Sequence, residues 1–230
     1  GGATAQKPLV TYTIMALCIL AYVGGQTVSG GVVEQWLIFA PFRILAYPWT
    51  FITSGFLHGS IMHLALNMWA LWVVGQHLER VLGHARYAAV YFTSIIAGHT
   101  AVLLLTDPLS QSWYSGTLGA SGGVFGLFAA IFVVQRRMGA ETAQIAIMIV
   151  LNLVITFTVP GISWQGGHLG GLIMGGALTA VMFALRPKAS PGRRPARPRP
   201  TLRLIHTAVI AAGILLCLVL IVLRVVMVNG

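Results

Sequence analysis

Long apolar runs separated by short polar or basic stretches dominate this sequence. A helix needs about 20 mainly apolar residues to cross a bilayer, because it rises about 1.5 Å per residue through a hydrocarbon core about 30 Å thick. Measured against that length, the pattern predicts seven spanning helices, at residues 8–25, 58–78, 86–106, 118–135, 142–159, 167–185 and 202–228. We therefore expect an all-α polytopic membrane protein.

The composition agrees with that fold class, since 57% of the residues are hydrophobic and 8% are charged, far from the averages of soluble proteins. The first run is not followed by a small-residue cleavage site and a soluble domain, so we do not interpret it as a cleaved signal peptide. The chain begins with Gly, and we expect residues 1–7 to be the truncated end of a longer N-terminal tail. Cys18 and Cys217 lie in distant apolar runs and are predicted to be small core residues.

The net charge of +10 does not indicate a nucleic-acid surface, because the basic residues cluster between the apolar runs. With the N-terminus in the cytoplasm, twelve of the 14 Lys and Arg residues face inward and only Arg43 and Arg224 face outward. Inner loops carry an excess of basic residues, so we expect the C-terminus outside. Residues 186–201, rich in Pro and Arg, predict an extended linker that faces anionic lipid. The inward residues are Lys7, Arg80, Arg86, Arg136, Arg137, Arg186, Lys188, Arg193, Arg194, Arg197, Arg199 and Arg203.

A serine lies among small residues in Gly119-Ala120-Ser121-Gly122-Gly123, at the head of the fourth run. Glycines on both sides remove side chains that would fill the space around its oxygen, which favours a nucleophile. Taken alone, such a cluster more often lets two helices approach closely, and a helical serine often bonds to its own backbone. The cluster therefore leaves packing and catalysis open.

Polar residues also interrupt the second and sixth runs. His63 and Asn67 are four residues apart and share one helix face, either as a functional pair or as an interhelical hydrogen-bonding pair. His168 is followed at i+3 and i+7 by Gly171 and Gly175, which form a stripe of small residues below the imidazole. Another helix can therefore approach closely beneath His168.

Two further ionisable residues are predicted to have structural roles. Glu79 lies between Gly75 and Gly83 near the inner end of the second run, which suggests a turn where the carboxylate accepts backbone or arginine hydrogen bonds. His99, in the third run, is predicted to be packed and hydrogen-bonded rather than a ligand.

Helical rise gives the depth of each polar site, counted from the charged inner end of its run. Ser121, His63 and His168 lie 14, 16 and 18 residues from those ends. The corresponding distances are about 21, 24 and 27 Å before tilt. All three positions fall in the outer third of a hydrocarbon core about 30 Å thick. Three separate segments thus place polar residues, which are energetically unfavourable inside a membrane, at one depth, and this favours a single site.

Elimination narrows the chemistry of that site. A paired-aspartate mechanism needs two carboxylates, and a zinc protease needs a run such as H-E-x-x-H. The acidic residues all lie in loops or at helix ends, no such run is present, and both lysines are cytoplasmic. Serine with histidine remains. The residues excluded from the site are Glu34, Glu79, Asp107, Glu141, Lys7 and Lys188.

The expected pair is a dyad of Ser121 and His168. Desolvation disfavours the charged form of a buried imidazole, so His168 should be neutral and able to accept the serine proton. No acid is available to orient the ring, so packing must hold it, and Phe125, one turn after Ser121, is placed to stack on it. The backbone N–H groups at the head of the fourth span, with His63 and Asn67, are candidate donors to an oxyanion.

These residues together resemble the rhomboid intramembrane serine proteases. The motifs that carry the resemblance cover nearly the whole chain, and their order and spacing are highly specific. The resemblance implies a six-helix core at residues 8–185 and an extra C-terminal helix at 202–228. The motifs are His58-Gly-Ser-Ile-Met-His63 with Asn67, Gly75-x3-Glu79-x3-Gly83, Gly119-Ala-Ser121-Gly122 and His168-x2-Gly171-x3-Gly175.

The resemblance also implies an activity and a site. The activity is that of a serine endopeptidase in a bacterial cell membrane, which admits single-span substrate proteins past its fifth helix and cuts near their outer face. No metal or organic cofactor is implied, and neither the substrate nor the oligomeric state follows from the sequence. The implied site comprises Ser121 and His168 as catalytic residues, His63, Asn67 and the Ser121 backbone as oxyanion donors, and Gly119, Gly122 and Phe125 as support.

Two departures from the family pattern are present. The first-loop Trp-Arg pair of the family is Trp49-Thr50 here, so Thr50 cannot supply the anchoring given to that arginine. Phe125 stands where tyrosine is common, and it can stack but not donate a hydrogen bond.

Two other classes of function remain to be compared. A relative that only binds would recognise client transmembrane helices without cutting them, and the intact Ser121 and His168 argue against it. A channel or carrier would use the polar residues as a path, but these stop in the outer third of the membrane. Cleavage that is lost in Ser121→Ala separates the protease from the binder, and ion flux that survives the change would indicate the channel.

Overall fold

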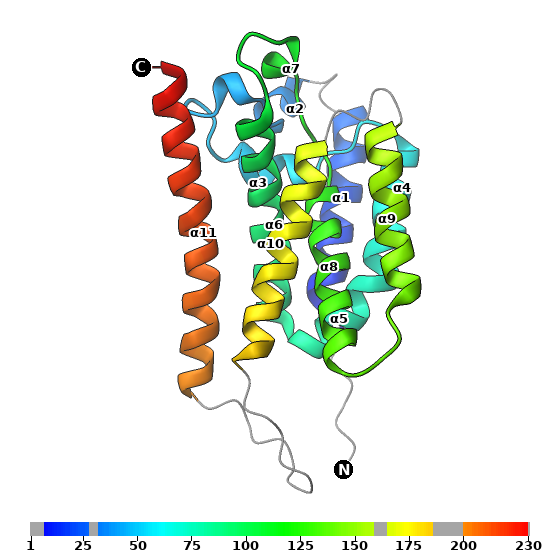
Figure 1. The fold of residues 1–230 in the computed structure, drawn as a ribbon. Helices are drawn as coiled ribbons and strands as arrows, with labels where there is room; N and C mark the ends of the chain where they lie inside the picture. Colours follow the sequence, from blue (N-terminus) through cyan, green and yellow to red (C-terminus); the bar gives the residue numbers. More distant parts are fainter. Residues whose placement is uncertain (1–6, 28–31, 159–164, 186–199, 230) are drawn as a thin grey trace, which may run out of the picture.

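Seven long helices, running up and down through one bundle, lie within the part of the chain that the structure describes (Figure 1). The structure is a computed structural model, and it describes residues 7–27, 32–158, 165–185 and 200–229. One of the long helices, Ile61–Leu82, is divided by a π-helical turn. The long helices are α1 (Leu9–Thr27), α4 (Ile61–Ala70) with η3 (Leu71–Gly75) and α5 (Gln76–Leu82), α6 (His84–Leu105), α8 (Ser121–Arg137), α9 (Ala143–Thr158), α10 (Gln165–Ala184) and α11 (Pro200–Asn229).

Each of the seven predicted runs overlaps one long helix, which confirms the all-α fold. The largest difference is in the second run, predicted at 58–78 and observed at Ile61–Leu82. The helix begins later because Ser60 is extended and its side chain accepts a 3.2 Å hydrogen bond from the backbone N–H of His63, as an N-cap does.

The described helices include several that could cross a membrane. By length and composition alone, His84–Leu105, Gly167–Ala184 and Leu202–Asn229 could each span it, and the pair Thr50–Phe56 and Ile61–Leu82, bent by 96°, could form a fourth span. The chain is therefore a multi-pass integral membrane protein.

Short helices connect the long ones at the upper end of the bundle in Figure 1. Four of them, α2 (Val32–Leu37), η1 (Pro41–Arg43), α3 (Thr50–Thr53) and η2 (Ser54–Phe56), form the connection between α1 and α4, and α7 (Gln111–Tyr114) follows α6. The start of α1 and the end of α11 lie at opposite ends of the bundle (Figure 1). The predicted tail at 1–7 and linker at 186–201 lie outside the described residues, except for Lys7 and the first two residues of α11.

The centre of the bundle is the close pairing of α8 with α10. A Cβ atom on Gly171 would overlap the carbonyl oxygen of Gly122, and one on Gly175 would overlap the backbone of Gly126. Only glycines allow two helix backbones to approach this closely. The small-residue stripe beneath His168 thus contacts another helix, as predicted, and that helix is α8.

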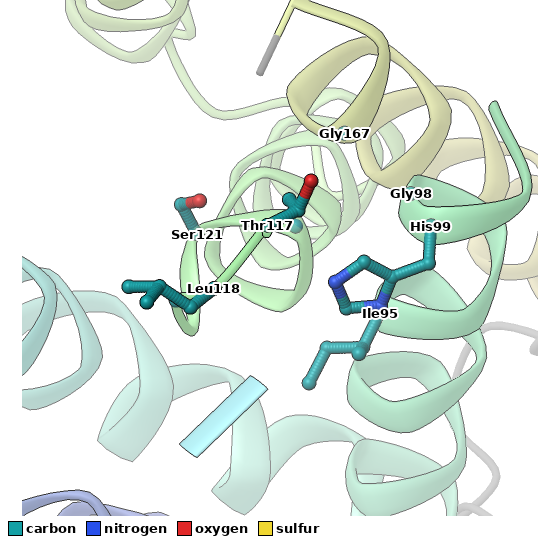
Figure 2. A pocket seen from close by; sticks show the side chains of 9 residues that line it. Ile95, Gly98, His99, Thr117, Leu118, Ser121 and Gly167 are labelled. Carbon is teal, nitrogen blue, oxygen red and sulfur yellow. The ribbon is translucent and has the colours of Figure 1, made fainter. Parts of the chain in front are cut away.

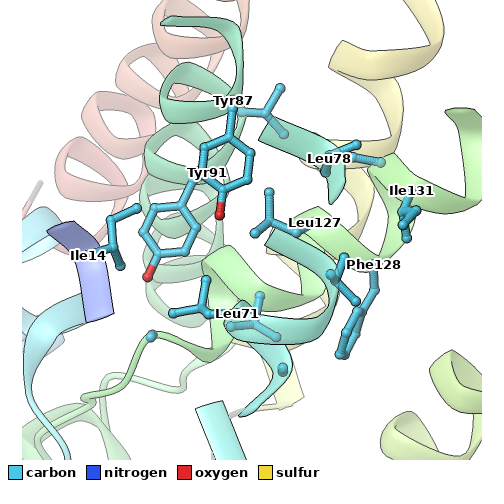
Figure 3. Packing of buried hydrophobic residues seen from close by; sticks show 14 of the residues in the cluster. Ile14, Leu71, Leu78, Tyr87, Tyr91, Leu127, Phe128 and Ile131 are labelled. Carbon is cyan, nitrogen blue, oxygen red and sulfur yellow. The ribbon is translucent and has the colours of Figure 1, made fainter. Parts of the chain in front are cut away.

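A large hydrophobic cluster packs α1, α4, α5, α6 and α8 together at one side of that pair (Figure 3). Tyr87 and Tyr91 of α6 are completely buried in it beside Leu71, Leu78 and Leu127. Cys18 belongs to the same cluster, and both it and Cys217 are free and buried, which confirms their prediction as core residues.

Glu79, in α5, joins that helix to the start of α1. Its carboxylate accepts hydrogen bonds from the backbone N–H groups of Val10 (2.9 Å) and Thr11 (2.8 Å) and from the Thr11 hydroxyl (2.7 Å). The predicted backbone hydrogen bonds are therefore present. The predicted turn is wrong at Gly75, which lies inside the helix Ile61–Leu82. Glycine is needed there because a Cβ would overlap the Tyr87 hydroxyl. The chain turns only at Gly83, where φ is +80°.

Candidate active site

Ser121 is the first residue of α8 and is half-buried. An extended segment descends from α7 to this point, so α8 begins part-way down the bundle rather than at its upper end (Figure 1). The backbone N–H groups in the first turn of a helix lack intrahelical acceptors and carry the positive end of the helix dipole. Ser121 therefore lies where the backbone can stabilise a negative charge inside the bundle.

Two backbone hydrogen bonds hold the segment that precedes Ser121. Thr117 N–H donates to the carbonyl of Phe39 at 2.7 Å, and Gly119 N–H donates to the carbonyl of Ser54 at 2.9 Å. Gly119 has φ +126°, and a Cβ there would lie 2.8 Å from Nε2 of His63 and 3.7 Å from the Ser121 hydroxyl oxygen. Glycine is thus required at 119 for both its backbone angle and the close approach of the His63 ring.

His63 and Asn67 occupy successive turns of α4. The amide nitrogen of Asn67 donates to the backbone carbonyl of His63 at 2.9 Å, and an amide has two N–H groups, so this bond uses one of them. The His63 ring also lies 4.9 Å, centroid to centroid, from the ring of His58. The structure therefore places His63 against the Gly119 backbone, with Asn67 buried one turn below.

His168 is buried in the first turn of α10 and packs against α8. Its ring stacks on Phe125, with centroids 4.3 Å apart and planes 11° apart, as expected from the one-turn spacing of Phe125 from Ser121. A Cβ on Gly122 would be 3.5 Å from the carbonyl oxygen of Gly167. The chain neighbours of Ser121 and His168 thus face each other across the α8–α10 contact.

A small cavity lies beside Ser121, between the extended segment, α6 and the start of α10 (Figure 2). Within the described residues, the buried hydroxyl of Thr117 has no hydrogen-bond partner. The cavity therefore lies next to the serine, with mainly apolar walls and a few polar side chains among them. It is lined by Ile95, Gly98, His99, Thr117, Leu118, Gly119, Ser121, Gly122 and Gly167.

His99, at the edge of this cavity, is packed and hydrogen-bonded as predicted. Its Nε2 lies 3.0 Å from the Ser54 hydroxyl and its Nδ1 lies 2.9 Å from the carbonyl of Phe51. Ser54 in turn accepts the hydrogen bond from Gly119, so His99 supports the serine segment indirectly. Sequence reasoning missed Ser54 and Thr117, because their contacts are formed by backbone atoms distant in sequence and no motif marks them.

The first loop is held without an arginine at position 50. Thr50 donates to the carbonyl of Tyr47 at 2.7 Å, and the Trp49 indole donates to the carbonyl of Trp36 at 2.9 Å. The Arg43 guanidinium donates to the carbonyl of Ile38 and lies 5.3 Å from the centroid of the Tyr47 ring. Arg43 therefore supplies cationic contacts within this loop, seven positions before Thr50.

No three His, Cys, Asp or Glu side chains among the described residues are grouped so that they could hold a metal ion. What the geometry assembles is a hydroxyl at a helix N-terminus, a stacked imidazole on the adjoining helix and a second imidazole against the intervening backbone. These groups can supply a nucleophile, a base and hydrogen-bond donors.

Comparisons with known proteins agree on one family. The sequence model of the Rhomboid domain matches residues 46–185. The Rhomboid protease GluP of Bacillus subtilis is 34% identical over 203 residues, which cover 82% of this chain and 37% of that protein. The RHOMBOID-like protein 5 of Arabidopsis thaliana is 32% identical over 147 residues, covering 61% and 45% respectively.

A more distant relative is the Rhomboid protease GlpG of Salmonella newport, which is 23% identical over 180 residues, covering 75% of this chain and 62% of that protein. The chain thus spans between 37% and 62% of the length of these three relatives.

Proposed function

This chain belongs to the rhomboid family, and from that premise we propose that it is an intramembrane serine endopeptidase, which hydrolyses peptide bonds in or near transmembrane segments of other membrane proteins. Two of its relatives carry the name rhomboid protease. The observation that carries the proposal for this chain is the stacking of Phe125 on His168, because it joins the turn that follows Ser121 to the imidazole.

Ser121 is the proposed nucleophile and His168 the proposed base. The Ser121 oxygen bonds to the scissile carbonyl carbon while its proton moves to the imidazole. When the tetrahedral intermediate collapses, the C–N bond breaks and His168 passes the proton to the leaving amine. A water molecule then attacks the acyl-serine and gives a proton to His168. When this second intermediate collapses, the bond between the acyl carbon and the serine oxygen breaks, His168 returns the proton to the Ser121 oxygen, and the new carboxyl terminus leaves. The stacking with Phe125 and the tight α8–α10 contact would hold the ring, in place of the acid that orients it in a triad.

The proposed oxyanion donors are the Ser121 backbone N–H, His63 and Asn67. Donors fixed before the reaction stabilise developing charge better than mobile water, because they need not reorient. The proposal is supported by the position of His63 against Gly119 and by the Ser121 N–H at the start of α8. The Asn67 amide has one further N–H group beyond its bond to the His63 carbonyl.

The proposed organisation follows the sequence prediction. Residues 8–185 form the catalytic core, 186–201 a basic cytoplasmic linker and 202–228 a seventh spanning helix, with the N-terminus in the cytoplasm of a bacterial cell. Substrates are transmembrane proteins that enter from the bilayer. The opposite positions of the α1 start and the α11 end agree with an odd number of crossings (Figure 1).

Labelling with a serine-reactive fluorophosphonate, followed by cleavage of a single-span substrate in liposomes, tests the proposal. The unmodified chain should be labelled and should cleave, and Ser121→Ala should do neither. His168→Ala should label at least about 1,000-fold more slowly, the scale of loss when a catalytic base is removed. Ser112→Ala is the matched control, because Ser112 is exposed on α7, and it should behave like the unmodified chain.

The alternative is a rhomboid-like protein that binds client helices without cutting them. If the unmodified chain binds a client helix but is neither labelled at Ser121 nor able to cleave, the binding function is correct and the protease function is wrong. Equal labelling of the unmodified chain and His168→Ala would show that the histidine does not activate the serine.

A further inference from the structure

Arg224 lies near the C-terminal end of α11, after a long run of apolar residues in that helix. Its guanidinium donates to the carbonyl of Leu103 at 3.2 Å and to the carbonyl of Thr106 at 2.7 Å, both at the end of α6. It also lies 5.8 Å from the centroid of the Trp113 ring in α7. One side chain of the seventh helix therefore contacts both the end of α6 and the short helix that follows it.

The chemistry of these contacts explains why an arginine is present. The last carbonyls of a helix have no intrahelical donors and carry the negative end of the helix dipole, so a cation is favoured there. A charged side chain in a membrane span is costly unless it finds such partners, and when it does it is a functional candidate. A planar guanidinium can bond two carbonyls and lie over an aromatic ring at the same time, which lysine cannot do.

Helix α11 contacts the bundle at more than one place, since Val209 and Ile210 pack against the large cluster. Many of the large apolar side chains of α11 are exposed, so much of the helix faces outward. Yet Ile221, Val225 and Val228, which flank Arg224 on the same helix face, pack against a second hydrophobic cluster. That cluster consists of Phe39, Ile44, Phe51, Val102, Leu103 and Trp113.

The same cluster leads by direct contacts to the serine segment. The carbonyl of Phe39 accepts the hydrogen bond from Thr117, and the Phe39 ring lies 4.6 Å from the ring of His99. His99 contacts the Ser54 hydroxyl, and the Ser54 carbonyl accepts the hydrogen bond from Gly119. The two backbone bonds that hold the segment before Ser121 therefore both depend on residues that pack in or beside this cluster.

We propose that Arg224 is a positioning residue of the proposed active site. By fixing the end of α6 and Trp113, it holds the start and the middle of the 107–120 segment in register with the first loop, and so sets the position of Gly119 and the Ser121 oxygen. The seventh helix is then a part of the catalytic apparatus rather than an appended anchor. The expected effect of Arg224 on cleavage rests on the proposed protease function. Its expected effect on the position of the 107–120 segment does not.

The structural effect is measured by amide hydrogen exchange of residues 107–120 in the full chain. In Arg224→Ala, the amides of Thr117 and Gly119 should exchange faster. The matched control is His206→Ala, which removes the 3.1 Å bond between the imidazole and the carbonyl of Met182 at the other end of α11. It also loosens the docking of the seventh helix, but it should leave exchange in 107–120 unchanged. A second control, Leu223→Ala, alters an exposed position beside Arg224 and should have no effect.

The kinetic effect is measured with the single-span substrate. Arg224→Ala should lower kcat roughly tenfold or more, since small misplacements of a nucleophile have effects of that size, while KM changes by no more than about twofold. Arg224→Lys should retain part of the activity, because the charge remains but the two-pronged bonding is lost. The proposal is wrong if Arg224→Ala and His206→Ala show the same kcat and the same amide exchange in residues 107–120.

Failure of the two proposals can be told apart. If the unmodified chain is neither labelled nor active in cleavage, the proposed protease function is wrong. Amide hydrogen exchange in residues 107–120 would still test whether Arg224 positions that segment. If Arg224→Ala does not yield folded protein, Arg224→Lys decides, since unchanged exchange and kcat in that variant would contradict the positioning role.

Discussion

Phe125 and His168 lie face to face, with their ring planes 11° apart and their centroids separated by 4.3 Å. Phe125 is also in edge contact with Phe128 on its own helix, at a centroid distance of 5.8 Å. The imidazole therefore rests on an aromatic surface that α8 itself holds rigid. This relationship gives a direct test of how the proposed base is oriented.

Replacing Phe125 with leucine should slow fluorophosphonate labelling of Ser121. An aromatic pair contributes about 0.5–1.5 kcal/mol beyond its buried area, which corresponds to roughly 2- to 13-fold in rate if it acts on the reactive geometry. Phe125→Tyr should retain the rate, because the ring remains. Phe132→Leu, on the same helix, is the control. Labelling of Phe125→Leu at the unmodified rate would mean that stacking does not orient His168.

Gly171→Ala should force α8 and α10 apart. The added Cβ would overlap the Gly122 carbonyl oxygen, and overpacking of this kind costs about 1–3 kcal/mol or more. Thermal unfolding in detergent should show a clearly lower midpoint.

The control for Gly171 is Gly24→Ala in α1, where an added Cβ meets nothing within 4 Å. That change should be neutral or slightly stabilising, because alanine lowers the entropy of the unfolded chain. Equal midpoints for the two variants would contradict the close helix pairing.

Gly119→Ala should reduce labelling of Ser121 by roughly 100-fold, because the new Cβ displaces the His63 ring and misplaces the segment before the serine. Gly139→Ala provides a matched comparison, since Gly139 also has positive φ, at +72°, but has open space around it. Both variants carry the backbone penalty of alanine at positive φ. A similar loss of labelling in both would attribute the effect to backbone strain rather than to His63.

Glu79→Gln should destabilise the fold by about 2 kcal/mol, because an amide N–H₂ would face donors that now bond to a carboxylate. The measurement is the thermal unfolding midpoint. Glu141→Gln, at an exposed position, should leave the midpoint unchanged. No difference between the two would mean that the junction of α5 with α1 contributes little to stability.

Much of the candidate site could be predicted from the sequence. Depth counting placed Ser121, His63 and His168 at one level, and spacing alone placed Phe125 one turn from the serine. The stacking of Phe125 on His168 is found as predicted, because helical geometry converts sequence distance into direction, and the common depth of the three polar residues stays a prediction. Ser54 and Thr117 could not be found in this way, since they act through backbone bonds to residues 65 and 78 positions away.

The sequence by itself determined the helices of this protein and the approximate ends of each, because lipid leaves backbone groups no partner outside a helix and so demands long apolar runs. Only the tertiary structure decided which surfaces meet. Periodicity shows that Gly171 and Arg224 each lie on a face, but it does not show that Gly122 and the end of α6 are their partners. Those choices depend on how all the helices pack at once, and no local pattern encodes them.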